Sequence, residues 1–194
     1  MSNRNQTRSR ITRAAWELFR RKGYQDTTIS DIIAAAGTSR GTFYHYFNSK
    51  DELLSTLSYM FDDFYREQLP LLDPDMNSCD KLIELSRACH KYIADTIPLE
   101  LLAQLYSSQV VTSGDKNLLD RNRFYYEAVQ GIIDEGQRRG QIDPTVSNYN
   151  AVHYYAMCER AIIYDWCIAG GSYDLADFTA VTLTRMLAGL RAGN

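Results

Sequence analysis

The chain has 194 residues, of which 45% are hydrophobic and 23% are charged, enough apolar content for a packed core and too much for a disordered chain. No apolar run approaches the roughly 18 residues that a membrane span needs. The polar, basic N-terminus lacks the apolar stretch of a signal peptide. We therefore expect a cytoplasmic protein with no membrane partner.

Charge is distributed unevenly along the chain. Residues 1–60 contain nine Lys and Arg residues and five acidic residues, a balance of +4, so the net charge of −3 leaves −7 on the remainder. A basic N-terminal part on an acidic body favours attraction of DNA to one face. A basic N-terminus also arises by chance, so charge alone leaves both interpretations open.

No segment alternates with period two, and the apolar spacing predicts an all-α fold of about nine helices. A polar, arginine-rich arm is expected over residues 1–10. Gly23, Gly37 and Gly140 are typical of helix ends, and Asp143-Pro144 of a helix start. The predicted helices lie near residues 7–22, 28–36, 40–47, 50–68, 80–96, 99–112, 117–139, 144–169 and 175–191.

The segment between Thr28 and Phe47 has the pattern of a helix-turn-helix. Asp31 follows Thr28 as a capping-box partner, and Gly37 suits a tight turn. Phe43 and Phe47 share one face of the second helix. Its other faces carry the hydrogen-bond donors Arg40, Thr42, Tyr44 and His45, which suits a helix that enters the major groove. The alternative is a generic helical hairpin with exposed polar residues.

Short motifs follow one another over more than forty residues of this region. They are Leu18-Phe19, Gly23, Thr27-Thr28, Ile29 and Ile32, Ala36-Gly37, Ser39-Arg40-Gly41-Thr42, Phe43-Tyr44-His45-Tyr46-Phe47 and Ser49-Lys50-Asp51-Glu52-Leu53. With these motifs, the stretch from Ile11 to Leu54 resembles the TetR/AcrR family of bacterial regulators. Thr38 stands where the family usually has an apolar residue, and Phe43 where Leu is commoner. Neither change removes a DNA-facing group.

The resemblance implies a set of DNA-binding residues. Arg40, Gly41 and Tyr44 are placed at base edges, where arginine reads guanine with two hydrogen bonds. Phosphate contacts are expected from Thr28, Thr42, His45, Tyr46 and Lys50, and Thr38 and Ser39 join the candidates at the start of the same segment. The arm arginines Arg4, Arg8, Arg10 and Arg13 either follow the DNA backbone or a minor groove, or belong to a solvated tail.

The resemblance also implies a division of labour along the chain. Residues 1–48 form the helix-turn-helix DNA-binding domain, and residues 49–194 form a ligand-binding and dimerisation domain. A homodimer is expected through the apolar helices near residues 148–169 and 175–191, as a four-helix bundle with their mates. Ordinary packing within one chain is the alternative for these helices.

An unknown small-molecule effector is expected in the body, which is rich in tyrosine. The family's pocket lies among the helices from about residue 50 to 169, so the candidate residues are Tyr65, His90, Tyr106, Tyr126 and Trp166. Each of them has a purely structural role as its alternative. Arg87 and Glu159, polar residues on apolar faces, are expected to orient a ligand or to pair with each other.

The motifs of common enzymes and metal sites are missing from the sequence. There is no GxSxG, P-loop, dinucleotide or HExxH motif, so we predict no catalytic residues. The four cysteines and three histidines lack zinc-ligand spacing, so no metal or cofactor is expected. The predicted function is a ligand-responsive regulator, a repressor released from a palindromic operator by its effector. The alternative is a DNA-bound structural or division factor of the same fold.

Overall fold

The computed structural model describes residues 3–111 and 116–193. Within these ranges the regular structure is helical and contains no strand, which confirms the all-α prediction. Thr112 and the predicted break at 113–115 lie outside the described residues. The α-helices are α1 (Asn3–Lys22), α2 (Ile29–Ala35), α3 (Arg40–Tyr46), α4 (Lys50–Leu54), α5 (Leu57–Gln68), α6 (Ser78–Thr96), α7 (Leu99–Val111), α8 (Phe124–Arg138), α9 (Asn148–Ile168) and α10 (Leu175–Met186). Short 3₁₀ helices are η1 (Leu69–Leu71), η2 (Asn117–Leu119) and η3 (Leu187–Leu190).

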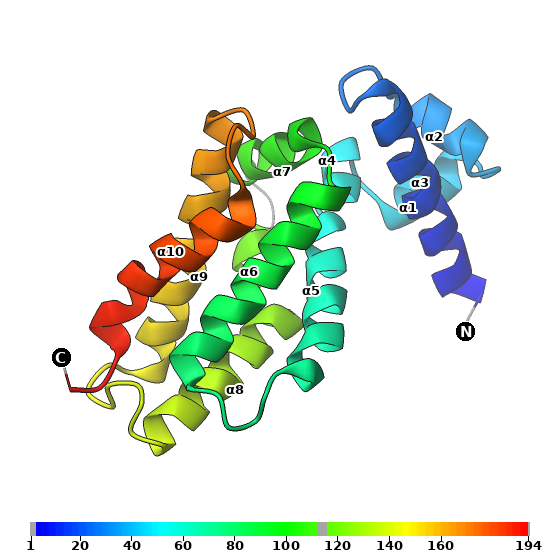
Figure 1. Ribbon diagram of the computed structural model, residues 1–194. Coiled ribbons are helices and arrows are strands. Elements are labelled where there is room, and N and C mark those ends of the chain that lie inside the picture. The colour runs from blue at the N-terminus through cyan, green and yellow to red at the C-terminus, as the bar shows by residue number, and fades with distance from the viewer. Residues whose placement is uncertain (1–2, 112–115, 194) are drawn as a thin grey trace. The chain divides into compact units, whose positions relative to one another are not determined.

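The chain divides into two compact units. The first unit joins Met1–Tyr59 to Glu100–Leu118, and the second joins Met60–Leu99 to Leu119–Asn194. In the second unit α6 packs against α8 and α10, and α9 packs against α8 and α10 (Figure 1). The predicted domain boundary between residues 48 and 49 concerns function and stays a prediction.

The first helix is longer than predicted. Residues 3–10, expected as an arm, belong to α1. No glycine or proline interrupts residues 3–22, so nothing stops the helix from continuing toward the N-terminus. The guanidinium carbon of Arg8 also lies 5.3 Å from the ring centroid of Phe47 and 6.0 Å from that of Tyr59. These contacts hold one predicted arm arginine against the folded unit.

The predicted helix over residues 50–68 is two helices, with a break at Ser55 and Thr56. Three neighbouring hydroxyls donate to backbone carbonyls here: Ser55 to Asp51 at 3.2 Å, Thr56 to Leu53 at 2.5 Å and Ser58 to Ser55 at 2.7 Å. Such bonds compete with the α-helical ladder. The indole nitrogen of Trp16 donates to the Thr56 hydroxyl at 3.0 Å and ties α1 to the break.

Two helices of the second unit begin later than predicted. Helix α8 starts at Phe124 and not near 117, because Asp120 accepts the backbone N–H of Asn122 at 2.9 Å and closes a turn. Asp143 forms a similar turn with the N–H of Thr145 at 2.8 Å, so α9 starts at Asn148 with Ser147 as its N-cap. At the chain's end, the predicted helix over 175–191 stops at Met186 and continues as η3.

Candidate nucleic-acid interface and effector residues

The two helices of the helix-turn-helix are fixed by side-chain caps. The Thr28 hydroxyl accepts the N–H of Asp31 at 3.1 Å, and the Asp31 carboxylate accepts the N–H of Thr28 at 2.8 Å, which confirms the predicted capping box. Ser39 caps α3 by accepting the N–H of Thr42 at 3.1 Å. Between them Gly37 has a φ of 57°, a left-handed conformation that suits glycine. The start of each helix is therefore set locally.

Helix α3 has a buried face and a polar exposed face. Phe43 and Phe47 are 0% and 1% exposed, so they anchor the helix as predicted. Tyr44 is 42% exposed, and the guanidinium carbon of Arg40 lies 5.7 Å from its ring centroid. Of the predicted DNA-binding residues, the exposed ones are Thr28, Ser39, Arg40, Gly41, Tyr44 and His45, and the half-buried ones are Thr38, Thr42, Tyr46 and Lys50.

Gly41 lies in the first turn of α3 and has room for a side chain. A Cβ atom built on it would meet only the Ser39 hydroxyl oxygen, at 3.9 Å. Its φ is not positive, so the backbone also has no need of glycine. Because glycine weakens a helix relative to alanine, the fold does not explain why position 41 is a glycine. Close approach of another molecule to the backbone at this position would explain it.

Lys50 is engaged within the protein. Its ammonium group donates to the carbonyl oxygens of Tyr24 at 2.7 Å, Thr27 at 2.9 Å and Gln25 at 3.4 Å. It also lies 4.2 Å from the Tyr24 ring centroid, and burial lowers the pKa of Lys50. The next residue, Asp51, accepts the Tyr24 hydroxyl. Lys50 and Asp51 thus hold the turn between α1 and α2, a role that the motif alone does not reveal.

A buried carboxylate organises the polar interior of the second unit. Glu159 is 5% exposed and accepts hydrogen bonds from the hydroxyls of Tyr65, at 2.9 Å, and of Ser86 and Tyr125. Burial raises the pKa of Glu159. Of the two alternatives predicted for Arg87 and Glu159, the pairing with each other is wrong, since Arg87 pairs with Glu84 at 2.7 Å on its own helix. Sequence reasoning missed Ser86 and Tyr125, whose spacing gives no signal of a shared partner.

A buried ion pair lies in the same unit. Arg123 donates two hydrogen bonds to Asp62, at 2.8 and 3.1 Å, and the two side chains are 5% and 3% exposed. The Asp62 carboxylate also accepts the backbone N–H of Tyr125 at 3.2 Å. A pair with several satisfied hydrogen bonds tolerates burial. It fixes the start of α8, from which Tyr125 reaches Glu159.

The five predicted effector residues fall into different surroundings. Tyr65 and Tyr126 both pack on the Tyr125 ring, with centroids 5.2 and 4.9 Å away. The indole nitrogen of Trp166 donates to a backbone carbonyl at 2.9 Å, and its ring lines a groove of about 460 Å³ with residues 94–99, 170 and 171. Tyr106 belongs to α7 in the first unit. Tyr65 and Tyr126 are thus brought together by a shared neighbour, whereas Tyr106 belongs to a different unit.

His90, the remaining candidate, is a buried core residue. Its Nδ1 atom lies 2.6 Å from the Thr179 hydroxyl oxygen, which itself donates to the carbonyl of Leu175 at 2.7 Å. The hydroxyl hydrogen is therefore used, so the imidazole donates through Nδ1. Burial lowers the pKa of His90 from 6.5 to about 3, so the ring is neutral at physiological pH.

Residues 3–111 and 116–193 contain no group of three or more His, Cys, Asp or Glu side chains arranged to hold a metal ion. Over the same part of the chain, no helix is both long and apolar enough to cross a membrane.

A capped helix-turn-helix with a polar outer face, followed by a helical body, defines a helix-turn-helix regulatory protein. Residues 11–57 match the family model of bacterial regulatory proteins of the tetR family. The chain is 30% identical over 146 residues to the transcriptional repressor KstR2 of Mycobacterium tuberculosis, covering 72% of each chain. The chain belongs to the TetR family of transcriptional regulators, which are ligand-responsive, DNA-binding proteins.

Other similarities agree with this assignment. The chain is 29% identical over 128 residues to the transcriptional regulator CymR of Pseudomonas putida, and the match covers 63% of this chain and 62% of that protein. FadR of Thermus thermophilus, a repressor solved with lauroyl-CoA, has a TM-score of 0.74 at 23% identity, over 94% of both chains. FadR of Bacillus subtilis, solved with stearoyl-CoA, has a TM-score of 0.68 at 21% identity, over 94% of this chain and 98% of that one. These relatives are transcriptional regulators and not enzymes.

Proposed function

We propose that the protein is a repressor that binds a two-fold DNA operator as a homodimer and leaves it when a small-molecule effector binds. The observation that carries the DNA part is the outer face of α3. It presents Arg40 and Tyr44 beside Gly41, a glycine that the fold itself does not require. We propose no catalytic activity, because recognition and release need only binding.

The interface residues are proposed in two groups. Arg40, Gly41 and Tyr44 face base edges, with Arg40 reading a guanine. The remaining candidates, namely Thr28, Thr38, Ser39, Thr42, His45 and Tyr46, face phosphates, where hydroxyls and helix N-termini are favourable donors. Lys50 is proposed to act from the turn before α2, since its ammonium group already binds three carbonyl oxygens.

The homodimer is proposed to form through α9 and α10. An apolar stripe runs along α9, where Tyr149, Met157, Tyr164 and Ile168 are 62%, 47%, 54% and 68% exposed. Val181 on α10 is 58% exposed. Exposed apolar side chains that share one face of a helix favour an interaction site. A two-fold dimer presents two copies of α3 to a palindromic site, about 34–36 Å apart.

The effector is proposed to bind in the second unit beside Tyr65 and Tyr126. There the Glu159 carboxylate and the Tyr125 hydroxyl supply polar groups within an apolar interior. The two FadR neighbours bind acyl-CoA molecules, and an acyl chain is one class of effector to test. His90 and Trp166 of the same unit stay in the proposed set, whereas Tyr106, which belongs to the first unit, does not. The effector acts through its different affinities for DNA-competent and DNA-incompetent states.

One experiment tests the whole scheme. The purified protein is used to select bound sequences from a random DNA library, and the selected site is then titrated at fixed salt with candidate effectors. We expect a two-fold site with half-sites about one helical turn apart, and an effector that weakens its binding. Binding without any preferred sequence would contradict the repressor proposal. A ligand that binds tightly but never changes operator affinity would contradict the release step alone.

A further inference from the structure

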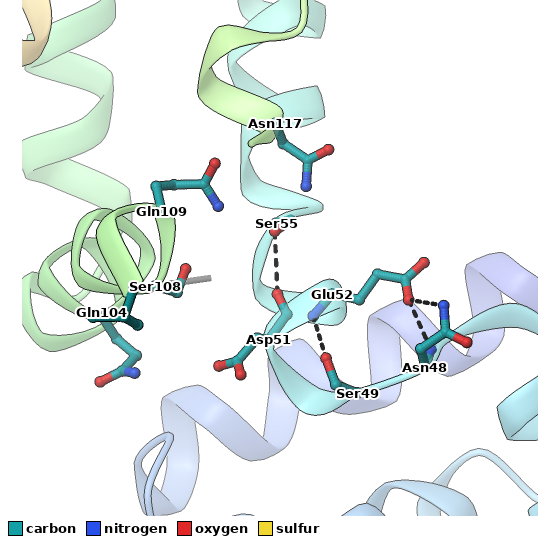
Figure 2. A pocket seen from close by; sticks show the side chains of 10 residues that line it. Asn48, Ser49, Asp51, Glu52, Ser55, Gln104, Ser108, Gln109 and Asn117 are labelled. Carbon is teal, nitrogen blue, oxygen red and sulfur yellow. Dashed lines mark hydrogen bonds between the residues drawn. The ribbon is translucent and has the colours of Figure 1, made fainter. Parts of the chain in front are cut away.

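A cavity of about 620 Å³ lies wholly within the first unit, between α4 and α7 (Figure 2). Asn48, Ser49 and the side chains of α4 form one wall, and α7 forms the other, with η2 at the edge. The volume is in the range of small-molecule sites. The lining residues are Asn48, Ser49, Asp51, Glu52, Ser55, Gln104, Ser108, Gln109, Val111 and Asn117.

The chemistry of this lining is unusual for a ligand pocket, because nine of the ten side chains that the structure describes there are polar and none of the ten is aromatic. Most drug-like ligands fill apolar, aromatic pockets. Of the ten lining residues that the structure describes, Asp51 and Glu52 are acidic and none is basic. The neighbouring ammonium groups of Lys50 and Lys116 donate to backbone carbonyl oxygens. Acidic side chains that line a cavity attract positive charge. The described lining therefore favours a small, polar, cationic occupant.

The two carboxylates keep free acceptor atoms. Asp51 Oδ1 accepts the Tyr24 hydroxyl, and Glu52 Oε2 accepts the backbone and side-chain N–H groups of Asn48 at 2.7 and 3.1 Å. The other oxygen of each carboxylate accepts no hydrogen bond from the described part of the chain. Figure 2 shows the Asp51 carboxylate directed toward Gln104 of α7. On the opposite wall, the Gln104 amide oxygen accepts the Gln25 side-chain N–H at 3.3 Å and keeps one lone pair.

A divalent metal ion fits this lining poorly. Calcium takes six to eight oxygen ligands, with several carboxylates among them, and the described lining residues offer two carboxylates. An aliphatic diammonium ion spreads its charge over two separated nitrogen atoms, and each nitrogen needs only a few hydrogen-bond acceptors. Carboxylate, amide and hydroxyl oxygens supply these acceptors.

We propose that the cavity between α4 and α7 binds a small organic ammonium ion, an aliphatic amine whose charge is balanced by Asp51 and Glu52. The amide oxygen of Gln104 on α7, which also accepts from Gln25, accepts from the same ligand with its second lone pair. The site is separate from the proposed effector residues of the second unit, and it does not depend on the repressor function. It lies beside the contacts of Lys50 and Asp51 that hold the turn before Thr28.

The test uses the full chain without DNA and isothermal titration calorimetry. The probe is 1,4-diaminobutane, and its uncharged counterpart is 1,4-butanediol. We expect one diamine per chain, a dissociation constant below about 1 mM, weaker binding at higher salt, and no measurable binding of the diol. The double substitution Asp51→Asn with Glu52→Gln keeps shape and acceptor oxygens but removes both charges. It is expected to weaken binding about ten-fold or more.

Two further variants make the result specific. Glu67→Gln with Glu127→Gln removes the same charge from exposed residues outside the cavity, and binding is expected to stay unchanged. Gln104→Met removes only an amide from the α7 wall and is expected to weaken binding of the diamine. Thermal unfolding of each variant shows that it is folded.

Four results would overturn the proposal: no saturable diamine binding, equal binding of the diol, equal loss in the two double variants, or magnesium ions competing with the diamine at equal concentration. Because no DNA is present, any of these outcomes leaves operator recognition untouched.

Discussion

The ammonium nitrogen of Lys50 lies 2.7 Å from the carbonyl oxygen of Tyr24 and 2.9 Å from that of Thr27. A charged donor with partly buried acceptors contributes about 1.5–3 kcal/mol per bond. A direct phosphate contact and a structural contact predict different responses of DNA binding to salt. This difference makes Lys50 the most informative residue of the proposed interface.

We predict that Lys50→Met lowers thermal stability and weakens binding to all DNA sequences, because the turn before α2 loses its anchor. The slope of log affinity against log salt is expected to stay unchanged. A direct phosphate contact would instead lower that slope by about one. Lys91→Met, on an exposed lysine of α6, is the control. A reduced slope with unchanged stability would show that Lys50 contacts phosphate.

Arg40→Ala is expected to weaken specific operator binding by about 1–3 kcal/mol and to relax the base preference at one position per half-site. The side chain is exposed and reaches outward beside Tyr44, so folding is expected to be unaffected. Competition binding with operators that carry each base at every position measures the effect. An unchanged base preference would contradict the role of Arg40 as a base reader.

Gly41→Ala separates stability from function. Alanine is favoured over glycine in a helix by about 0.5–1 kcal/mol, and the site has room for a methyl group. We therefore expect equal or higher stability in urea unfolding, together with weaker operator binding in a fluorescence titration. A variant with full DNA affinity would show that the backbone at Gly41 does not approach DNA closely.

The stability of the protein is predicted to depend on the protonation of His90. Its pKa is 6.5 ordinarily and about 3 in the folded protein, so between these values the unfolded chain binds the extra proton. The contribution of neutral His90 to the free energy of unfolding is fully present above pH 6.5 and is lost as the pH falls toward 3. Between about pH 7.5 and about pH 5.5 the loss amounts to roughly 1.4 kcal/mol.

Urea unfolding at the two pH values measures this loss, and His90→Asn supplies the control. Asparagine keeps a donor near the Thr179 hydroxyl but does not titrate. The difference in pH dependence between the two proteins isolates His90 from Glu159 and the other acids. Equal pH dependence in both proteins would mean that folding does not change the pKa of His90.

Charges placed on the exposed stripe of α9 are expected to separate the dimer. Met157→Glu with Tyr164→Glu puts two acids on each partner, and like charges desolvated at an interface repel. Sedimentation should then show monomers, and operator affinity should fall steeply because each helix-turn-helix contacts only one half-site. His153→Glu adds a single acid at an exposed position on the same helix and is expected to weaken the dimer less than the double variant. A double variant that stays dimeric would show that the interface does not include this stripe of α9.

Local signals in the sequence were sufficient for much of the fold. Three helices have the caps that their residue types suggest, namely Thr28 with Asp31 on α2, Ser39 on α3 and Asp174 on α10. Hydroxyl groups caused the main errors, since Ser55 and Thr56 break a helix whose apolar pattern continues through them. Asp143 precedes a proline and has the signature of a cap, yet its carboxylate closes a turn.

The candidate sites could be predicted only where they are local. The outer face of α3 follows from helical spacing within ten residues. The Glu159 cluster joins side chains 34 to 94 residues apart, and a single sequence carries no signal for such distances. The carbonyl partners of Lys50 are backbone atoms 23 to 26 residues away, which no pattern of residue types records.

The chain contains two tryptophans, and each belongs to a different unit. Trp16 donates to Thr56 at the break between α4 and α5, while Trp166 donates to Tyr173 in the second unit. Replacing Trp166 by Phe leaves a single indole fluorophore hydrogen-bonded at the point where α4 gives way to α5. Its emission then offers an intrinsic optical reporter of that break during titrations with DNA or amine, with no label attached.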